Sequence, residues 1–419
     1  MLLFMALGAL AGFWITWLTI TLARRLQFGS DESAGVQKFH DHWVPRLGGV
    51  PVFAAFVISL VTAALLSGGG LDSSLRLIIC TLPAFGIGLL EDVTRRAGVA
   101  PRLLFTMIAA AVGWWLLDGR LDRLDLPVID GLLVTVPLAA FALTLFAAGG
   151  VAHAVNIIDG YNGLSGFFIA AALAGLGLVA WQAGDGPLLR MSMIAMASVL
   201  GFLAWNFPYG RIFLGDSGAY FLGFLVAEMA ILLVHRNPQV SAWCPLLLMI
   251  YPVWETVFSM IRRGRAGGFS HMGQPDARHL HQLIYRRLMK RYLGSTDPRD
   301  RILRNSMTSV YLWGLALMSI VPAVLFWNDT ILLMAFTALF AVSYLVVYCA
   351  IVRFRVPRWL VAKPRDASRT VRCPPALRAG AAGAGIPASA FPAAVSVCVQ
   401  TRTAAVLPGT AVPAAHPPQ

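Results

Sequence analysis

Charged residues are scarce in this sequence. Only 13% of its 419 residues are Asp, Glu, Lys or Arg, and 58% are hydrophobic, whereas soluble domains average about 25% charged residues. Uninterrupted apolar runs recur along the chain, each about as long as the 17 to 25 residues with which a helix crosses a bilayer. Backbone polar groups in hydrocarbon must be bonded within their own segment, so such runs indicate helices rather than barrel strands. The composition excludes a soluble globule and predicts an all-α polytopic membrane protein.

Cysteines in paired or metal-binding patterns are also lacking. The five cysteines are odd in number and widely spaced, at Cys80, Cys244, Cys349, Cys373 and Cys398. This spacing fits neither a disulfide framework nor a zinc site. The first three lie within apolar runs, so we interpret them as core residues without chemical roles.

Eleven apolar segments are candidates for membrane helices. No basic residue precedes the first one, so we interpret it as a retained helix rather than a cleaved signal peptide. The expected spans cover approximately residues 2–23, 47–67, 73–90, 102–117, 132–152, 163–183, 188–207, 218–235, 242–261, 306–327 and 330–352. They define a membrane-embedded domain, residues 1–352, followed by a tail, residues 353–419. From about residue 367 this tail is rich in Ala and Pro without helical periodicity, which is typical of disorder.

Lys and Arg are distributed unevenly between the loops. The most basic loops follow odd-numbered spans, chiefly the first, third and ninth, and such loops mark the cytoplasmic side of a membrane. This rule predicts an N-terminus outside and a C-terminus in the cytoplasm. The same bias accounts for the net charge of +13 without a nucleic-acid partner.

Polar motifs gather in the loops that this topology places in the cytoplasm. The orientation follows from Lys and Arg alone, yet it brings acidic, amide and histidine residues to one face. These residues are Lys38, His40, Arg46, Glu91, Asp92, Asn156, Asp159, Asn162, Asp216, His279 and His281. We therefore expect one composite site at the cytoplasmic end of the helices, and no comparable constellation in the opposite loops.

Three carboxylates are candidates for metal binding and proton transfer. Glu91 and Asp92 are adjacent at the end of a helix, where two negative charges repel one another and meet an unfavourable dipole, so they require a cation nearby. A solvated helix end balanced by the two arginines that follow is the alternative. Asp216 lies in a Gly-Asp-Ser-Gly turn, where a ligand can approach closely, and carboxylate oxygen is the preferred Mg²⁺ ligand. Asp216 could instead cap the next helix.

Cationic residues in the first and last of these loops suggest a phosphorylated ligand. Lys38, His40 and Arg46 precede a Gly-Gly pair, and His279 and His281 lie among several arginines. Arg forks and Lys ammonium groups bind phosphate oxygens. For each loop taken singly, ordinary positive-inside content is the alternative.

Taken in series, the motifs resemble those of the polyprenyl-phosphate N-acetylhexosamine-1-phosphate transferase superfamily. The resemblance covers about residues 1–352. Its motifs are Pro-Arg-Leu-Gly-Gly at 45–49, Gly-Leu-Leu-Glu-Asp at 88–92, Asn-Ile-Ile-Asp-Gly-Tyr-Asn-Gly-Leu at 156–164, Phe-Leu-Gly-Asp-Ser-Gly at 213–218 and Arg-His-Leu-His-Gln-Leu at 278–283. The segments around Lys38 and Glu91 look more like the lipopolysaccharide and O-antigen branch than the peptidoglycan branch.

The resemblance implies a reaction and a set of residues. Family members transfer a sugar 1-phosphate from a UDP-N-acetylhexosamine to undecaprenyl phosphate at the cytoplasmic face of the bacterial inner membrane. They release UMP and use Mg²⁺, for which Mn²⁺ is an alternative. By this resemblance the catalytic residues are Glu91, Asp92 and Asp216, of which Asp216 binds the metal. The substrate-binding residues are Lys38, His40, Arg46, Asn156, Asp159, Asn162, His279 and His281. Membrane lipid is a further partner, a homodimer is compatible with the family, and nucleic acid is not expected.

Three positions depart from the family pattern. The acidic pair is usually Asp-Asp but begins here with Glu91, the second Asp of the central loop is Asn162, and the histidine motif ends in Gln282. These changes affect the expected donor sugar more than the expected reaction.

Two mechanisms are compatible with the residues. Asp92 or Glu91 could orient or deprotonate the lipid phosphate for direct attack, or a carboxylate could form a covalent phospho-intermediate. We favour direct attack, because a phosphate with a second pKa near 6 is largely dianionic at pH 7.

Two other interpretations stay open. A transporter or channel could use Glu228 and Glu255, which lie within expected spans, as pathway charges. Against it, the sequence has no internal repeat, and its polar residues gather at one interface rather than at mid-membrane. An inactive homologue is the second, because of Glu91, Asn162 and the atypical tail.

Overall fold

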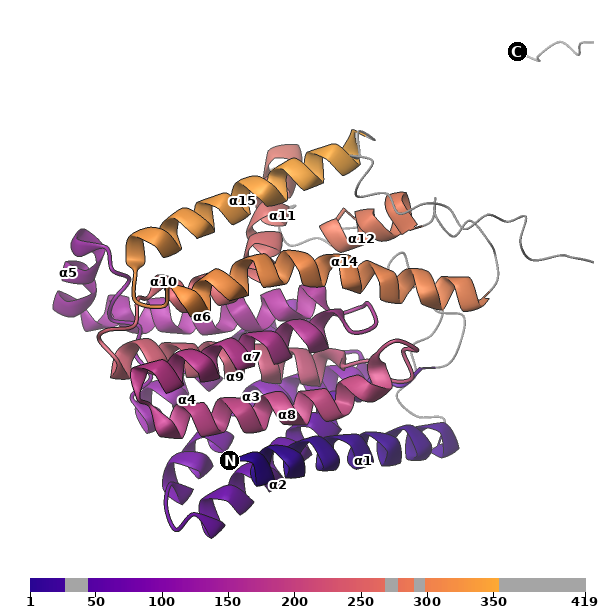
Figure 1. Ribbon diagram of the computed structural model, residues 1–419, viewed down its shortest axis with the longest axis horizontal. Coiled ribbons are helices and arrows are strands. Elements are labelled where there is room, and N and C mark those ends of the chain that lie inside the picture. Colours follow the sequence, from indigo (N-terminus) through magenta and orange to yellow (C-terminus); the bar gives the residue numbers. More distant parts are fainter. Residues whose placement is uncertain (27–43, 268–277, 290–297, 354–419) are drawn as a thin grey trace, which may run out of the picture. The chain divides into compact units, whose positions relative to one another are not determined.

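The computed structural model describes residues 1–26, 44–267, 278–289 and 298–353 (Figure 1). The regular elements in this part of the chain are helices, and ten of them are long and apolar enough to cross a bilayer. The predicted all-α polytopic membrane protein is therefore confirmed. Lys38, His40 and the tail from residue 354 lie outside the described residues, so the expectations for them stay predictions.

The ten candidate spans correspond to ten of the expected ones. They are α1 (Leu2–Leu26), α2 (Gly49–Leu66), α3 (Leu71–Thr94), α4 (Val99–Leu117), α6 (Pro137–Ile158), α7 (Leu164–Ala183), α8 (Gly186–Asn206), α9 (Gly215–Arg236), α14 (Pro298–Leu325) and α15 (Thr330–Val352). The other elements are α5 (Pro127–Thr135), α10 (Trp243–Leu248), α11 (Ile250–Gly267), α12 (Leu280–Leu283) and the π-helix η2 (Ile284–Met289).

The ninth expected span, 242–261, is not a single helix. The chain breaks at Met249 between α10 and α11, and Figure 1 shows α11 running across the direction of its neighbours. α11 is not one of the ten candidate spans, because its second half carries Arg262, Arg263 and Arg265. The number of continuous apolar helices in the described chain is therefore ten rather than eleven. The orientation of the N-terminus stays a prediction.

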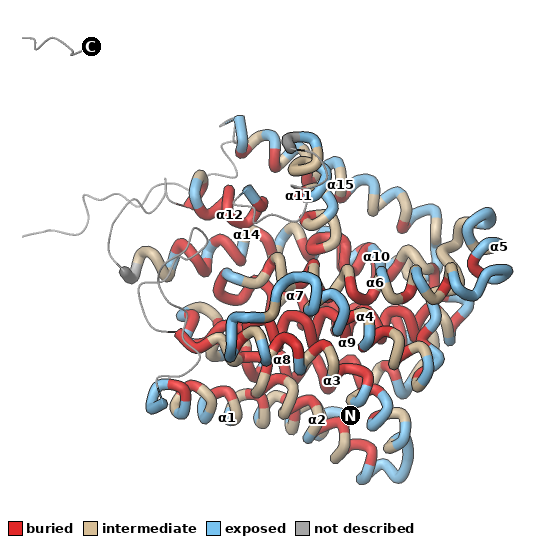
Figure 2. The backbone as a smooth tube through the Cα atoms, turned by 180° about the vertical axis from the view of Figure 1, so that it is seen from behind, coloured by how far each residue is buried: buried red, intermediate tan, exposed pale blue. Residues whose placement is uncertain are grey.

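α9 lies at the centre of the bundle. All of its residues from Gly215 to Val234 are buried (Figure 2), and it packs against α2, α3, α4, α6, α7 and α8. Glycines allow two of these close contacts: a Cβ on Gly49 of α2 would lie 2.2 Å from the Gly218 backbone nitrogen, and one on Gly88 of α3 would lie 2.5 Å from the Asp216 carbonyl oxygen. Small residues commonly allow membrane helices to approach this closely. As a result, the N-terminus of α9 is held directly against α3.

The outer helices expose large apolar side chains. Trp14 and Trp17 on α1 are 58% and 45% exposed, and Ile331 on α15 is 80% exposed. A soluble protein rarely leaves such extended apolar surface uncovered. These faces are therefore suited to contact with lipid.

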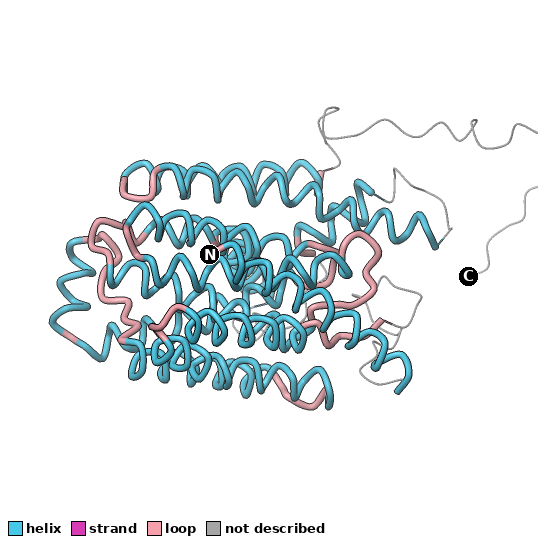
Figure 3. Tube along the Cα trace, turned by 60° about the horizontal axis from the view of Figure 1, so that its bottom comes forward, coloured by secondary structure: helices cyan, strands magenta, loops and turns pink. Residues whose placement is uncertain are grey.

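Loops gather at the two ends of the bundle (Figure 3), and the end at the C-terminus of α9 has a polar network. His235 Nδ1 lies 3.0 Å from Asp122 Oδ2. Asp125 accepts hydrogen bonds from the hydroxyls of Ser241 at 2.7 Å and Thr330 at 3.1 Å. The expectation that the loops at this end hold no comparable constellation is therefore wrong. Through Asp125, the loop before α5 is bonded to the loop before α10 and to the start of α15.

Candidate functional site

Asp92, near the end of α3, is bonded to the N-terminus of α9. Its Oδ1 accepts the backbone N–H of Asp216 at 2.8 Å, and its Oδ2 accepts the backbone N–H of Ser217 at 2.9 Å and the Ser217 hydroxyl at 2.6 Å. The first N–H groups of a helix have no partner within the helix, and the helix dipole favours a carboxylate beside them. Asp92 therefore caps α9 from a neighbouring helix, a role that Asp216 does not perform itself.

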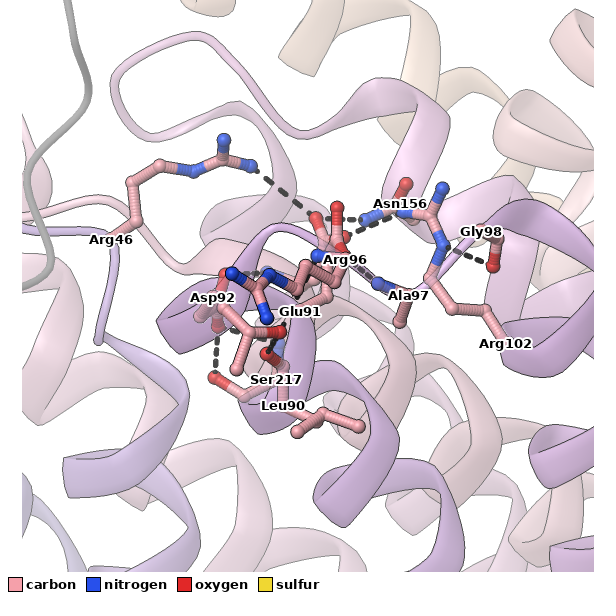
Figure 4. A network of polar contacts seen from close by, with 12 residues as sticks. Arg46, Leu90, Glu91, Asp92, Arg96, Ala97, Gly98, Arg102, Asn156 and Ser217 are labelled. Carbon is pink, nitrogen blue, oxygen red and sulfur yellow. Dashed lines mark hydrogen bonds and ion pairs between the residues drawn. The ribbon is translucent and has the colours of Figure 1, made fainter.

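Asp216 is surrounded by cationic and amide groups, those of Arg46, Arg102 and Asn156, whose side chains converge in Figure 4. Arg102 Nη1 lies 2.8 Å from its Oδ2, and Arg46 Nη2 lies 3.3 Å from its Oδ1. The Asn156 amide donates a hydrogen bond to Oδ1 at 3.0 Å. The Asp216 side chain is only 8% exposed, and a carboxylate so buried is stable only with such partners. Asp216 is therefore the point where the loop before α2 and helices α4, α6 and α9 meet.

Glu91 bonds a different part of the chain from its neighbour. Its Oε2 accepts the backbone N–H of Ala97 at 2.8 Å, in the turn that follows α3 (Figure 4). Glu91 thus holds the turn before α4, whereas Asp92 holds α9. These contacts give no support to a joint action of the two carboxylates on one ligand, which stays a prediction.

A cavity of about 1140 Å³ lies beside these groups. The predicted residues on its wall are Arg46, Asn156, Asp159, His279 and His281. Much of the remaining wall is apolar and comes from α4, α6, α9, α10 and α11, with Leu103, Phe146, Ile231, Trp243 and Val253 as examples. The structure therefore places five predicted site residues around one space that has a polar part and an apolar part.

Asp159 follows α6 directly and faces this cavity. Its Oδ1 accepts a hydrogen bond from the Ser165 hydroxyl at 2.6 Å. Burial raises the pKa of the Asp159 carboxyl to about 6, and the Ser165 bond and the charge of Arg46 only partly oppose this rise. The carboxyl therefore changes its charge close to neutral pH.

Asn162, three residues further on, is directed elsewhere. It is fully buried and is not among the described residues that line the cavity. Its side-chain amide donates to the Pro208 carbonyl at 3.0 Å, and its backbone N–H donates to the side-chain oxygen of Asn305 at 2.7 Å. These bonds join the central loop to the turn after α8 and to α14. A contact between Asn162 and substrate stays a prediction without support from this geometry.

His279 and His281 lie at the start of α12 and face the cavity together. Their rings are nearly parallel, with centroids 5.3 Å apart. His279 Nδ1 lies 3.0 Å from Glu255 Oε1. Glu255, a pathway charge under the transporter interpretation, is therefore bound to a residue of the candidate site.

Three residues of the site are not among the residues predicted from the sequence, although Ser217 lies within the motif at 213–218. They are Arg102 and Ser217, described above, and His153, which lines the cavity with its ring 4.9 Å from that of Tyr220. No hydrogen-bond partner of His153 Nε2 occurs among the described residues. His153 lies one helical turn before Asn156, and residues three apart share a helix face, which is a usable signal. Arg102 has no such signal, because its partner Asp216 is 114 residues away.

Asp216 is the candidate ligand for a cation, and its carboxylate is bonded to the guanidinium groups of Arg46 and Arg102 and to the Asn156 NH2 group. The described part of the chain holds no group of three or more His, Cys, Asp or Glu arranged to bind a metal. Mg²⁺, however, is usually held by one or two carboxylates, and water and substrate phosphates complete its coordination. Asp216 and Asp159, whose charges interact, fit this requirement, whereas Asn156 turns its amide nitrogen toward Asp216. A cation that binds the Asp216 carboxylate would displace one of the arginines bonded to it, Arg46 or Arg102.

Comparison with known proteins relates this arrangement to a family. Residues 74–234 match the family described as Glycosyl transferase family 4, a segment that includes Asp92, Arg102, Asn156, Asp159 and Asp216. The probable undecaprenyl-phosphate N-acetylglucosaminyl 1-phosphate transferase of Bacillus subtilis (strain 168) is 27% identical over 263 residues, which are 62% of this chain and 70% of the relative.

Two further relatives agree with this match. The undecaprenyl-phosphate alpha-N-acetylglucosaminyl 1-phosphate transferase of Escherichia coli (strain K12) is 29% identical over 287 residues, covering 65% of this chain and 74% of the relative. The phospho-N-acetylmuramoyl-pentapeptide-transferase of Streptococcus gordonii is 29% identical over 225 residues, covering 52% and 67%. The predicted resemblance is confirmed: residues 74–234 match glycosyl transferase family 4, and the chain is distantly similar to the undecaprenyl-phosphate N-acetylglucosaminyl 1-phosphate transferases.

Proposed function

We propose that this protein transfers an N-acetylhexosamine 1-phosphate from a UDP-sugar to undecaprenyl phosphate and releases UMP. The donor is UDP-N-acetylglucosamine or a related UDP-N-acetyl amino sugar. The reaction takes place at the cytoplasmic face of a bacterial inner membrane, where it initiates O-antigen, lipopolysaccharide or another cell-envelope glycan. The observation that supports this proposal best is that one cavity combines phosphate-binding cations with an apolar wall.

The polar part of the cavity suits two phosphorylated substrates. Arg46 and Arg102 lie on its wall within bonding distance of Asp216, and His279 and His281 lie on the same wall. The donor pyrophosphate and the lipid phosphate are both anions, so their approach requires positive charge between them. Guanidinium groups supply such charge together with directional hydrogen bonds.

The apolar part of the cavity suits the polyprenyl chain. Apolar side chains of α6, α9, α10 and α11 cover most of its surface. Each methylene group that is removed from water contributes about 0.8 kcal/mol. A lipid phosphate has the combination of anionic head and long apolar tail that this wall would bind.

The proposed reaction is a direct displacement. An oxygen of the lipid phosphate attacks the sugar-linked phosphorus, a new P–O bond forms, and the P–O bond to the departing UMP breaks. Mg²⁺ bound at Asp216 would offset the negative charge of the pyrophosphate and of the leaving group. Asn156 and Asp159 provide directional hydrogen bonds for the nucleotide or the sugar.

Asp92 is proposed to position Asp216 rather than to attack phosphorus. Both of its carboxylate oxygens are bonded to the N-terminus of α9, and the residue is only 7% exposed. A phospho-Asp92 intermediate would remove the carboxylate charge and displace the groups bonded to the phosphorylated oxygen, which would weaken the cap of α9. This geometry favours direct attack by the lipid phosphate.

The proposal can be tested on membranes that contain the protein. Undecaprenyl phosphate, Mg²⁺ and a panel of UDP-N-acetylhexosamines are added, and UMP release is measured. We expect UMP release with at least one donor and no release after Mg²⁺ is removed. In Asp216→Ala and Asp92→Asn the rate of release should fall by at least about 100-fold. This is the size of effect typical when groups that stabilise transition-state charge are removed. If the wild-type protein releases no UMP with any of the donors, the proposal is wrong.

A further inference from the structure

Arg46 lies beside the two carboxylates that are suited to bind a cation. Its Nη2 is 3.3 Å from Asp216 Oδ1, and its positive charge also acts on the Asp159 carboxyl. The negative charge of Asp216 acts on Asp159 as well. The charge of one guanidinium thus stabilises both carboxylates.

The backbone of Arg46 is fixed, whereas its side chain is partly exposed. Phe213 N–H donates to the Pro45 carbonyl at 2.9 Å, and Gly48 N–H donates to the Phe213 carbonyl at 2.9 Å. These bonds join the segment before α2 to the residues just before Asp216. The Arg46 side chain is 36% exposed and lines the cavity. Because an arginine side chain has several rotatable bonds, its guanidinium can change partners while α9 keeps its position.

Arg102, the other arginine on Asp216, is held more firmly. Its Nη1 lies 2.8 Å from Asp216 Oδ2, and its Nε donates to the Gly98 carbonyl at 3.2 Å. Its guanidinium carbon also lies 6.0 Å from the centre of the Tyr220 ring. Bonds between a charged N–H donor and a carboxylate are usually about 2.7 to 2.9 Å long, so the contact of Arg46 is the longer one. Arg46 is therefore the arginine that a competing cation displaces more easily.

A guanidinium and a divalent cation repel one another when both are on the Asp216 carboxylate. A divalent cation binds a carboxylate oxygen directly, so on Oδ1 it would be close to the Arg46 guanidinium. Repulsion is strong where a site is shielded from water, and the Asp216 side chain is only 8% exposed. Competition of this kind requires only the charge of Arg46 beside Oδ1, whatever else its side chain contacts.

We propose that Arg46 competes with the divalent cation for Asp216, and that its guanidinium moves to a phosphate of the donor when the cation binds. This inference rests on the proposed function, because the donor pyrophosphate supplies the new partner. Cation and donor then bind cooperatively, since the cation releases the guanidinium that the phosphate accepts. Without the donor, the same arginine weakens cation binding.

Mn²⁺ binding to the purified full-length protein without nucleotide tests the competition. Free Mn²⁺ is measured by electron paramagnetic resonance, and the Kd of the wild type is compared with that of Arg46→Gln. We expect Arg46→Gln to bind Mn²⁺ about tenfold more tightly, a change within the range typical of coupled sites. Asp216→Asn should abolish this binding, both alone and combined with Arg46→Gln.

The same substitution should weaken nucleotide binding. Radiolabelled UDP, the part common to all donors of the panel, is the probe, and its binding is measured by equilibrium dialysis at saturating Mn²⁺. We expect Arg46→Gln to bind UDP at least about tenfold more weakly, because a hydrogen bond from a charged group is lost. Opposite changes of the two affinities distinguish the exchange from a structural role, since a disrupted site would bind both ligands more weakly.

Two variants are controls for charge. Arg46→Lys keeps the competing positive charge, so its Mn²⁺ affinity should stay within about threefold of the wild type. Arg211→Gln changes the net charge by the same amount as Arg46→Gln. The guanidinium carbon of Arg211 lies 5.4 Å and 5.6 Å from the ring centres of Trp205 and Tyr209, and we expect its loss to leave Mn²⁺ affinity unchanged. Melting temperatures verify that each variant is folded.

The outcomes separate the two proposals. The competition is wrong if Arg46→Gln binds Mn²⁺ no more tightly than the wild type, if Asp216→Asn binds it equally well, or if Arg211→Gln gains as much affinity. Movement to a phosphate is wrong if Arg46→Gln binds UDP as tightly as the wild type. The Mn²⁺ measurement involves no turnover, so a wild type that binds Mn²⁺ as expected but releases no UMP with any donor would contradict the proposed function alone.

Discussion

At the scale of single residues, neighbouring carboxylates have separate tasks. Asp92 caps α9, Glu91 bonds the turn before α4, and Asp216 holds two arginines and an amide. Asp159 faces the cavity and accepts a hydrogen bond from the Ser165 hydroxyl. Carboxylates of the same chemical type thus differ in function because of the groups to which each is bonded.

The Asp159 carboxyl provides a test of this environment through the pH dependence of stability. Because burial raises its pKa from 3.8 to about 6, the folded protein binds more protons here than the unfolded chain between these pH values. The stabilising contribution is complete below about pH 4 and is lost as the pH rises through 6. At 1.4 kcal/mol per pH unit, the resulting destabilisation at pH 7.5 is at most about 3 kcal/mol.

Asp159→Asn keeps an acceptor for the Ser165 hydroxyl and removes the charge. We expect a higher melting temperature than that of the wild type at pH 7.5, a smaller difference near pH 4.5 and none near pH 3, measured on the purified protein by thermal unfolding. A variant that is less stable than the wild type at all of these pH values would contradict the raised pKa. If Asp159 binds substrate, Asp159→Asn should also release UMP more slowly than the wild type.

Residue types at the site could be predicted from the sequence, but their partners could not. Arg46, Asn156 and Asp159 stand in motifs whose residue types suit phosphate, amide and metal chemistry, and all three line the cavity. The ion pair of Arg102 with Asp216 joins positions 114 residues apart and has no local pattern. Asn162 has the same residue type as Asn156 and occupies the same motif, yet it is buried against α14, because only packing determines which amide faces the cavity.

At the scale of helices, long apolar runs were sufficient to locate ten spans. The break between α10 and α11 escaped this criterion, because the apolar run continues across Met249. A local signal was nevertheless present: Pro252 lies in the first turn of α11, a position where proline is tolerated because helix N–H groups there have no partner. The direction of α11 depends on its contacts with α6, α14 and α15, which the sequence does not encode locally.

The contact between α3 and α9 provides a test at this scale. In Gly88→Ala, the new methyl group would lie 2.5 Å from the Asp216 carbonyl oxygen and from Ser217 Cα, so the helices must separate. We expect a destabilisation of about 1 to 3 kcal/mol and a loss of UMP release, because Asp92 and Asp216 move apart. Gly86→Ala on the same helix is the matched control.

Gly86 has no atom within 4 Å of the position of an added Cβ. Alanine is the better helix former by up to about 1 kcal/mol, so Gly86→Ala should be neutral or slightly stabilising and should keep full activity. Thermal unfolding and the UMP assay compare the two variants. Equal effects of both substitutions would show that helix propensity, rather than the approach of α3 to α9, determines the outcome.

At the scale of the whole molecule, the predicted site residues that the structure describes lie in the membrane-embedded domain. The described chain ends just after α15, and residues 367–419 contain no acidic residue. We expect truncation after Arg365 to leave UMP release and melting temperature unchanged. Truncation after Asn328 is the control. It removes α15 with Tyr344, whose hydroxyl is bonded to Glu255, and we expect it to abolish release, as measured on membranes with equal amounts of protein.

The burial of α9 has a consequence for how the protein is made. α9 is apolar enough to enter the bilayer by itself, yet its folded surface is covered by other helices. The helices that pack against it, α2, α3, α4, α6, α7 and α8, all precede it in the chain. During synthesis its neighbours are therefore already inserted when α9 emerges from the ribosome, and α9 exchanges lipid for protein contacts as it docks among them. Asp92 and Asp216 meet only at that moment, whereas His279 and His281, which follow α9 in the chain, complete the wall of the cavity afterwards.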